Sequence, residues 1–119
     1  MLASCGTGPS ERDTEKVVDR FQAAIAASEG RAACAQLTED LRGTLESDEG
    51  KPCVSAVLGL GLRGGGRAVR SRVYITSALV DVAGGGAAFL DQTRSGWRIS
   101  AADCVRSASA AKYDCRLKD

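Results

Sequence analysis

Cysteine is the residue type that could carry the most chemistry in this 119-residue chain, which holds five cysteines and no histidine. The spacings contain no C-x-x-C pair and fit no zinc module, so we expect neither a metal nor a cofactor. Setting Cys5 aside leaves an even set of four, for which three disulfide pairings exist. We favour Cys34–Cys53 and Cys104–Cys115, because each pair is local in sequence. Such bridges persist in an oxidising compartment, so the set predicts export.

Cys5 stands in the string Leu2-Ala3-Ser4-Cys5-Gly6, which resembles a bacterial lipobox. At such a site the cysteine becomes the lipidated first residue of a mature lipoprotein. A secretory signal needs a basic region and an apolar stretch. Only residues 1–4 precede Cys5, so we expect that the signal peptide has been removed from this sequence. Residues 1–10 would then be a lipobox remnant and tether. The alternative is an ordinary cysteine near a frayed N-terminus.

Acid–base chemistry would have to use carboxylates, because histidine, the usual choice, is absent. If the turn at Gly84-Gly85 has two residues, Asp91 falls on the apolar face of its strand. A carboxylate buried among aromatic side chains could act as a general base. A register slip of one residue would send Asp91 to solvent and make Asp81 the better candidate. The alternative is a surface or hydrogen-bonded aspartate without a catalytic role.

The segment Gly59-Leu60-Gly61-Leu62-Arg63-Gly64 spells G-x-G-x-x-G. The dinucleotide-binding motif requires a strand before it and a helix after it, so that backbone N–H groups meet the pyrophosphate. Here a helix is expected before the segment and a strand after it. We therefore interpret the segment as a flexible helix-to-strand connection.

Three arginines, Arg67, Arg70 and Arg72, form a basic stripe with Tyr74 on one predicted strand. The stripe could hold an anionic ligand or face anionic lipid headgroups. The alternative is a solvated face whose arginine stems cover the sheet.

Charge and hydropathy exclude two classes of protein. Sixteen basic residues nearly cancel fifteen acidic ones, so no basic field is present to hold a nucleic acid. No run of about 18 apolar residues is present, so no membrane-spanning segment is expected. We expect residues 11–119 to form one α+β domain.

The first half of the chain has helical patterning. Ser10-Glu11-Arg12-Asp13 matches a capping box, and the apolar residues that follow recur at helical spacing up to a stop near residues 28–30. Further helices are expected over residues 31–37, along residues 37–45 and after Pro52. A Cys34–Cys53 bridge would then join two helices.

The second half alternates with a period of two. Strands are expected over residues 69–76, 78–82, 87–93 and 97–101, with glycines at 84–86 forming a turn. A loop over residues 104–115 would follow, closed by its disulfide. Helices first and an antiparallel sheet second is α+β order. On the two-residue turn, we expect Val80, Phe89, Trp97 and Ile99 to line a pocket on the apolar face.

Several short motifs carry a resemblance to a known family: Ala33-Cys34-Ala35-Gln36-Leu37, Gly50-Lys51-Pro52-Cys53, Gly96-Trp97-Arg98-Ile99 with Ala101-Ala102-Asp103-Cys104, and Tyr113-Asp114-Cys115. With the order of helices and strands, they resemble small actinobacterial lipoproteins of the nuclear-transport-factor-2-like (cystatin-like) superfamily. The resemblance implies a cone, in which N-terminal helices pack on a curved antiparallel sheet and form a pocket on its concave face. Enzymes of the superfamily use polar groups in that pocket for acid–base chemistry, and members often dimerise through the sheet.

These observations together predict an extracytoplasmic domain, anchored to the outer face of the cell membrane by a lipid on Cys5, with a binding or accessory role. Its partner would be a small apolar ligand or an envelope protein, and we also expect a homodimer through the sheet. One alternative is a small isomerase or cyclase that uses Asp91 or Asp81. A second alternative is a structural envelope protein whose filled core leaves no pocket.

Overall fold

The computed structural model describes residues 8–107 and 112–119, so the predicted lipobox around Cys5 lies outside the described residues. The described helices are α1 (Pro9–Ala26), α2 (Gly30–Cys34), α3 (Glu39–Glu49) and α4 (Cys53–Gly59). The described strands are β1 (Ala68–Tyr74), β2 (Ser77–Val82), β3 (Gly86–Thr93), β4 (Gly96–Arg106) and β5 (Tyr113–Lys118). No helix of the described part is long and apolar enough to cross a membrane.

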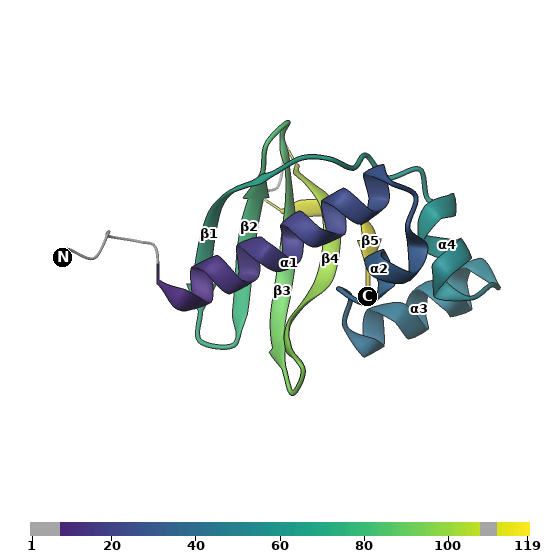
Figure 1. Cartoon of the computed structure of the whole chain (residues 1–119), viewed down its shortest axis with the longest axis horizontal. Helices are drawn as coiled ribbons and strands as arrows, with labels where there is room; N and C mark the ends of the chain where they lie inside the picture. Colours follow the sequence, from purple (N-terminus) through teal and green to yellow (C-terminus); the bar gives the residue numbers. More distant parts are fainter. Residues whose placement is uncertain (1–7, 108–111) are drawn as a thin grey trace.

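The five strands form one antiparallel sheet in the order β1-β2-β3-β4-β5. Helix α1 crosses one face of the sheet, and α2, α3 and α4 gather beside the β4–β5 side (Figure 1). The predicted α+β class is confirmed. The strand β5 lies partly in the segment we expected to be a loop, and it pairs with the second half of β4.

Helix α1 begins at Pro9 and not after Ser10, so Pro9 and Ser10 belong to the helix and not to the expected tether. Proline suits the first helical position, because its missing N–H has no partner there and its φ is already helical. The N–H of Gly8 donates to Glu11 Oε1 at 2.9 Å. The helix ends at Ala26, and the left-handed residue after it is Ser28 (φ 56°), not Gly30 as expected.

The buried stripe of α1 is the predicted one, with Val17, Val18, Phe21 and Ala24 in the core. These side chains pack with the inward-facing residues of the sheet. Two hydrogen bonds also join the helix to β1. Thr14 is fully buried, and its Oγ1 lies 2.7 Å from Ser71 Oγ of β1. The N–H of Ala68 donates to Asp19 Oδ1 at 2.8 Å. Helix α1 is therefore held on the sheet mainly by apolar burial, with two hydrogen bonds that fix its position along β1.

We expected Leu37 to be helical, but it pairs with Ile99 of β4 instead. The N–H of Thr38 donates to Ile99 O at 2.9 Å, and the N–H of Ile99 donates to Gln36 O at 2.7 Å. Thr38 then caps α3, because its side chain accepts a hydrogen bond from the N–H of Leu41 at 3.1 Å. Residues 36–38 thus cover the edge of β4 that β5 does not reach, which removes an open sheet edge.

The two predicted disulfides are confirmed. Cys34–Cys53 joins α2 to α4, and Cys104–Cys115 joins β4 to β5 across directly paired positions. A hydrogen bond supports the first junction, since the N–H of Cys53 donates to Glu46 Oε2 of α3 at 2.8 Å. The three short helices are therefore tied to one another by one covalent bond and one hydrogen bond, in addition to packing.

Strand β1 is shorter than predicted. It ends at Tyr74, and Ile75, which we expected on the apolar face, lies in the β1–β2 turn. Val69 sits where the pairing with β2 shifts register, and it is exposed, also against expectation. The inward side chains of β1 are Ser71 and Val73, which pair with Val80 and Ala78. A single bulge therefore removes one apolar residue from the face that α1 covers.

Replacing Gly30 by alanine should lower the free energy of unfolding by about 1–3 kcal/mol, because the new methyl group would overpack the contact between α2 and α4. A Cβ at Gly30 would lie 2.8 Å from Val54 Cγ1 and would also collide with the Val54 carbonyl oxygen. Urea unfolding measures the change. Gly43→Ala is the matched control: it lies in exposed helix with open space around it and should gain up to about 1 kcal/mol. An equal change in the free energy of unfolding for the two variants would contradict the packing argument.

Removing either disulfide by a double cysteine-to-alanine substitution should cost about 3 kcal/mol, because each bridge restricts the unfolded chain. The bridges close 19 and 11 residues, so loss of Cys34–Cys53 should cost about 0.5 kcal/mol more than loss of Cys104–Cys115. Urea unfolding of both double variants tests this order. A reversed order would show that native-state packing, and not loop closure, determines the effect.

Candidate functional site

The register of the β2–β3 hairpin decides which side chains share a face, and it differs from the expected one. Val82 pairs with Gly86, so the turn has three residues, Ala83 to Gly85. Gly84 and Gly85 both adopt positive φ, near 95°. The slip of one residue pairs Val80 with Ala88 and places Phe89 on the face away from α1.

Three of the four residues expected to line a pocket lie in the core instead. Val80 and Ile99 are fully buried, and Trp97 is 6% exposed. They belong to the cluster that α1 covers, together with Phe21 and Leu90. The fourth, Phe89, is half-buried on the opposite face, where its ring stands edge-on to Tyr113 with centroids 5.3 Å apart. The inner face of the sheet is thus occupied by packed side chains where we expected a pocket.

The two candidate catalytic carboxylates lie on the face away from α1. Asp91 pairs with Ser77 and is exposed, so the expectation of a buried acid on the apolar side is wrong. Asp81 is half-buried and forms an ion pair with Arg72, with 3.2 Å between Arg72 Nη2 and Asp81 Oδ2. Asp81 also borders a cavity of about 240 Å³ that includes Arg106 and Tyr113. Neither carboxylate lies among the core aromatics.

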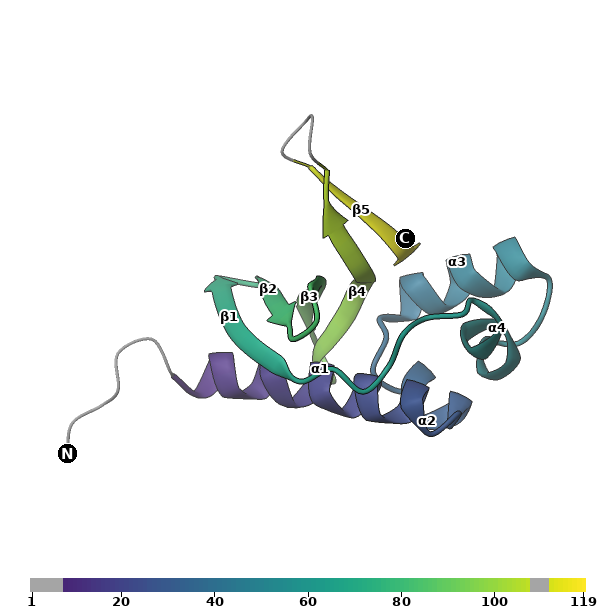
Figure 2. The same cartoon turned by 90° about the horizontal axis from the view of Figure 1, so that it is seen from above.

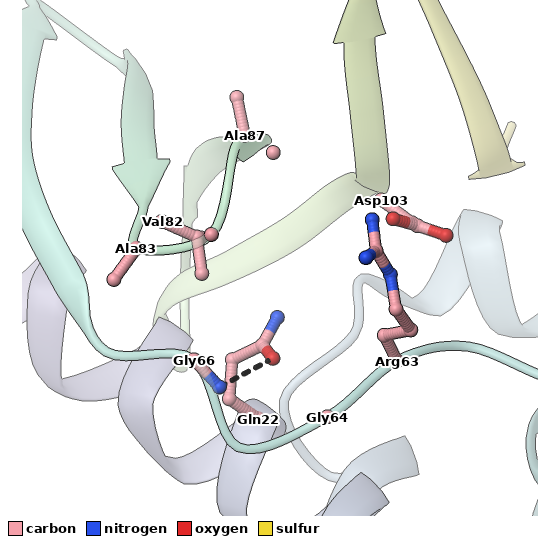
Figure 3. Close-up of a pocket in the computed structure, with 10 residues that line it drawn as sticks. Gln22, Arg63, Gly64, Gly66, Val82, Ala83, Ala87 and Asp103 are labelled. Atoms are coloured by element: carbon pink, nitrogen blue, oxygen red, sulfur yellow. Dashed lines mark hydrogen bonds between the residues drawn. The ribbon is translucent and has the colours of Figure 1, made fainter.

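A different cavity, of about 220 Å³, opens where the β2–β3 turn meets α1. It is built from four elements: Gln22 of α1, residues 63–66 of the connection before β1, the β2–β3 turn, and Asp103 of β4 (Figure 3). Three polar side chains reach it, those of Gln22, Arg63 and Asp103, while glycine and alanine form much of the remaining wall. This cavity is the candidate functional site.

Glycines of the G-x-G-x-x-G region allow the walls to approach closely. A Cβ at Gly64 would lie 2.8 Å from Gln22 O, and a Cβ at Gly66 would lie 2.6 Å from Val82 Cγ1. The N–H of Gly65 donates to Gln22 O at 2.9 Å. As predicted, the segment leads from a helix to a strand and does not match the dinucleotide motif. Gly64, at the end of the segment, is packed against α1, and Gly66 just after it is packed against β2, so close approach explains these two glycines. Gly61 instead adopts a positive φ of 69° with open space around it.

A bulge in β4 directs Asp103 into the cavity. Phe89 pairs with Ala101 and Ala87 pairs with Cys104, so β4 has one residue more than β3 over this stretch. Asp103 adopts φ 54°, a left-handed conformation that aspartate tolerates better than most residues. Bulges of this kind commonly re-aim a side chain beside a binding site. The carboxylate of Asp103 is therefore presented by a local irregularity that regular pairing would not produce.

The polar groups of the cavity are complementary in charge. In Figure 3 the guanidinium of Arg63 and the carboxylate of Asp103 point toward each other. Gln22 Oε1 accepts a hydrogen bond from the N–H of Gly66 at 3.3 Å, which leaves its amide NH₂ to donate. The site thus offers one cation, one anion and one neutral donor within a small volume. Among residues 8–107 and 112–119, no cluster of acidic or cysteine side chains could hold a metal ion.

The predicted basic stripe is partly neutralised. Arg67 forms an ion pair with Asp19 of α1, with 3.6 Å between Arg67 Nε and Asp19 Oδ1, and Arg72 is paired with Asp81. Arg67 remains largely exposed, and Arg70 is exposed as well. This pairing favours the solvated interpretation of the stripe over an anion site.

Sequence reasoning missed all three polar residues of the cavity. The sequence pattern of β4 does not indicate a bulge, so it gives no sign that Asp103 lies in a site. Arg63 and Gln22 lie in a connection and on a helix flank, positions that periodicity does not mark. The one usable signal was the density of glycines at 64–66 and 84–86, which indicates close approach of two backbones.

No family model, curated protein or solved structure matches this chain.

Substituting Asp103 tests whether its left-handed backbone is required. The free energy of unfolding of Asp103→Asn should lie within about 0.5 kcal/mol of that of the natural chain, since asparagine also tolerates this conformation. Asp103→Val should lose about 1–3 kcal/mol, because a β-branched residue is strained at this φ. Thermal and urea unfolding measure both variants. If valine were tolerated as well as asparagine, Asp103 would not sit in a demanding bulge.

Proposed function

We propose that this chain is an extracytoplasmic binding domain, held at the membrane by a lipid on Cys5, that takes a small polar ligand in the cavity formed by Gln22, Arg63 and Asp103. The observation that carries this proposal is the bulge that turns the Asp103 carboxylate into the cavity opposite Arg63. Bulges that re-aim polar side chains are over-represented beside functional sites.

The two disulfides support the proposed extracytoplasmic location. Both disulfides are formed, and they are consistent with an extracytoplasmic domain, because such bonds persist in oxidising environments. The lipid on Cys5 rests on the lipobox-like string alone. A short tether would then place the domain close to the membrane surface.

The fold we propose is the nuclear-transport-factor-2-like cone of small lipoproteins. Helix α1 lies across one face of an antiparallel meander, and the sheet bends where β4 carries its bulges (Figure 2). These features fit the proposal in element order and layer arrangement. A homodimer through the exposed sheet face remains a prediction of the same resemblance.

The chemistry of the cavity changes the class of ligand from the one the sequence suggested. We expected a small apolar molecule or an envelope protein, but the described cavity presents charged and amide groups. Its volume of about 220 Å³ fits a molecule of amino-acid or dipeptide size. A zwitterion satisfies both charges, with a carboxylate on Arg63 and an ammonium group on Asp103.

The enzyme alternative is weaker at its original residues. Asp91 faces solvent, and Asp81 is held by Arg72. The structural-protein alternative is supported by the filled inner face but leaves the bulge and the Arg63–Asp103 arrangement without a role. Ligand binding accounts for both.

Thermal unfolding in the presence of single amino acids and dipeptides tests the binding site. At least one zwitterionic compound should raise the unfolding midpoint, since binding to the folded state alone stabilises it. Asp103→Asn and Arg63→Gln should each abolish that rise. Arg94→Gln is the matched control, because Arg94 is an exposed arginine in the β3–β4 turn, away from the cavity. A rise that survives both cavity substitutions would disprove this site.

Mass spectrometry of the protein isolated from its host envelope tests the anchor. We expect the mature chain to begin at Cys5 and to carry the mass of a lipid, and Cys5→Ser should release the protein from the membrane fraction. A native N-terminus elsewhere, or an unmodified Cys5, would overturn the anchor while leaving the cavity proposal intact.

A further inference from the structure

The tip of the β1–β2 hairpin exposes two large apolar side chains. Ile75 is 92% exposed and Tyr74 is 59% exposed. Single exposed apolar residues are ordinary on protein surfaces. An isoleucine and a tyrosine together at the outermost point of a hairpin are unusual, because turns are commonly formed by glycine, asparagine, aspartate or serine.

The backbone of Ile75 makes this choice of residue more unusual. Its φ is 55°, in the left-handed region that β-branched residues avoid. Glycine or asparagine would form this turn without strain. Ile75 therefore contributes no packing to the fold and strains its own turn. Strain of this kind, held at an exposed position, points to a use outside folding.

The tip lies at the end of the molecule where α1 begins. Residues of the first turns of α1, Glu11 and Glu15, border one groove with β1 up to Tyr74. Both views show the start of α1 and the β1–β2 turn at the same end (Figures 1 and 2). The β3–β4 turn lies at this end too, and the N–H of Gln92 donates to Thr76 O at 2.8 Å. The tip is therefore supported by its neighbouring hairpin.

The length of chain between the predicted anchor and α1 limits how far this end can stand from a membrane. Cys5 precedes Pro9 by four residues. A fully extended chain of four residues spans at most about 14 Å. A lipid on Cys5 would thus keep the start of α1, and with it the hairpin tip, close to the bilayer surface.

We propose that Tyr74 and Ile75 insert into the bilayer interface as a second, non-covalent membrane contact, which fixes the orientation of the domain. This inference rests on the proposed attachment at Cys5. Tyrosine favours the interface, because its ring is apolar and its hydroxyl stays wet. Arg94 in the adjacent turn is exposed and can extend toward headgroups.

The contact is apolar and not electrostatic. The charges near this end are mixed: the first turns of α1 carry Glu11, Asp13 and Glu15 but also Arg12 and Lys16. Together with Arg94 they give no excess of positive charge that would attract anionic lipids. Insertion should therefore be similar on zwitterionic and anionic vesicles. Loss of insertion on purely zwitterionic vesicles would overturn the apolar contact.

The experiment supplies the anchor chemically, by coupling the Cys5 thiol to a maleimide-bearing lipid in phosphatidylcholine vesicles. Ile75→Trp places a fluorophore at the tip, and brominated acyl chains quench tryptophan that enters the membrane. Ala27→Trp, at the exposed far end of α1, is the matched control. The natural chain reports the background of buried Trp97.

We expect quenching of Ile75→Trp to exceed that of Ala27→Trp by at least about twofold. Equal quenching of the two variants would overturn the proposal and leave the exposed tip to a protein partner. A second measurement uses no tryptophan at the tip: Ile75→Asn, which suits the left-handed turn, should make Tyr74 more accessible to iodination on the same vesicles. Unchanged accessibility would also count against insertion. Because the lipid is attached by chemistry, these results do not depend on whether Cys5 is lipidated in the cell.

Discussion

Strand β4 is paired along both edges, and it changes direction between Ile99 and Cys104. Its first half lies between β3 and residues 36–38 and places Trp97 and Ile99 under α1. Its second half pairs with β5, which the Cys104–Cys115 disulfide holds in place. Two register shifts against β3 separate these halves, and they allow the bend visible in Figure 2. The positions of α2, α3 and α4 beside the sheet, of the β4–β5 pair and of Asp103 all depend on this bend.

The sequence predicted the features that local chemistry determines. The disulfide pairing followed from sequence proximity, and the buried stripe of α1 followed from helical spacing. Helix ends were less predictable, because more than one residue could serve at each of them. Pro9 competed with Ser10 at the start of α1, and Ser28 took the left-handed conformation expected of Gly30. Tertiary contact decided the second case, since Gly30 is needed where α2 approaches Val54.

The register of the β2–β3 hairpin could not be predicted, and the expected pocket failed with it. Leu79 and Phe89 face away from α1, while Val80 and Leu90 face toward it. Both faces of the hairpin therefore carry apolar side chains, so alternation does not distinguish one register from the other. Three consecutive glycines at 84–86 accept a turn of either length. The observed register buries Ala88 and Leu90 beneath α1 and keeps the charged Asp91 exposed to solvent.

The filled interior explains why the candidate site lies at the end of the sheet. Among the described residues, the buried polar side chains are Thr14 and Thr38, and both form hydrogen bonds. An acid–base site inside this core would have no group to use, and introducing a charge there would carry a large desolvation cost. On the side of the sheet that α1 covers, charged side chains are accordingly found where the regular layers stop. The bulge at Asp103, the glycine-rich connection and the β2–β3 turn meet at one such position. The irregular backbone that made this site invisible to pattern analysis is thus the same feature that allows charged side chains to converge there.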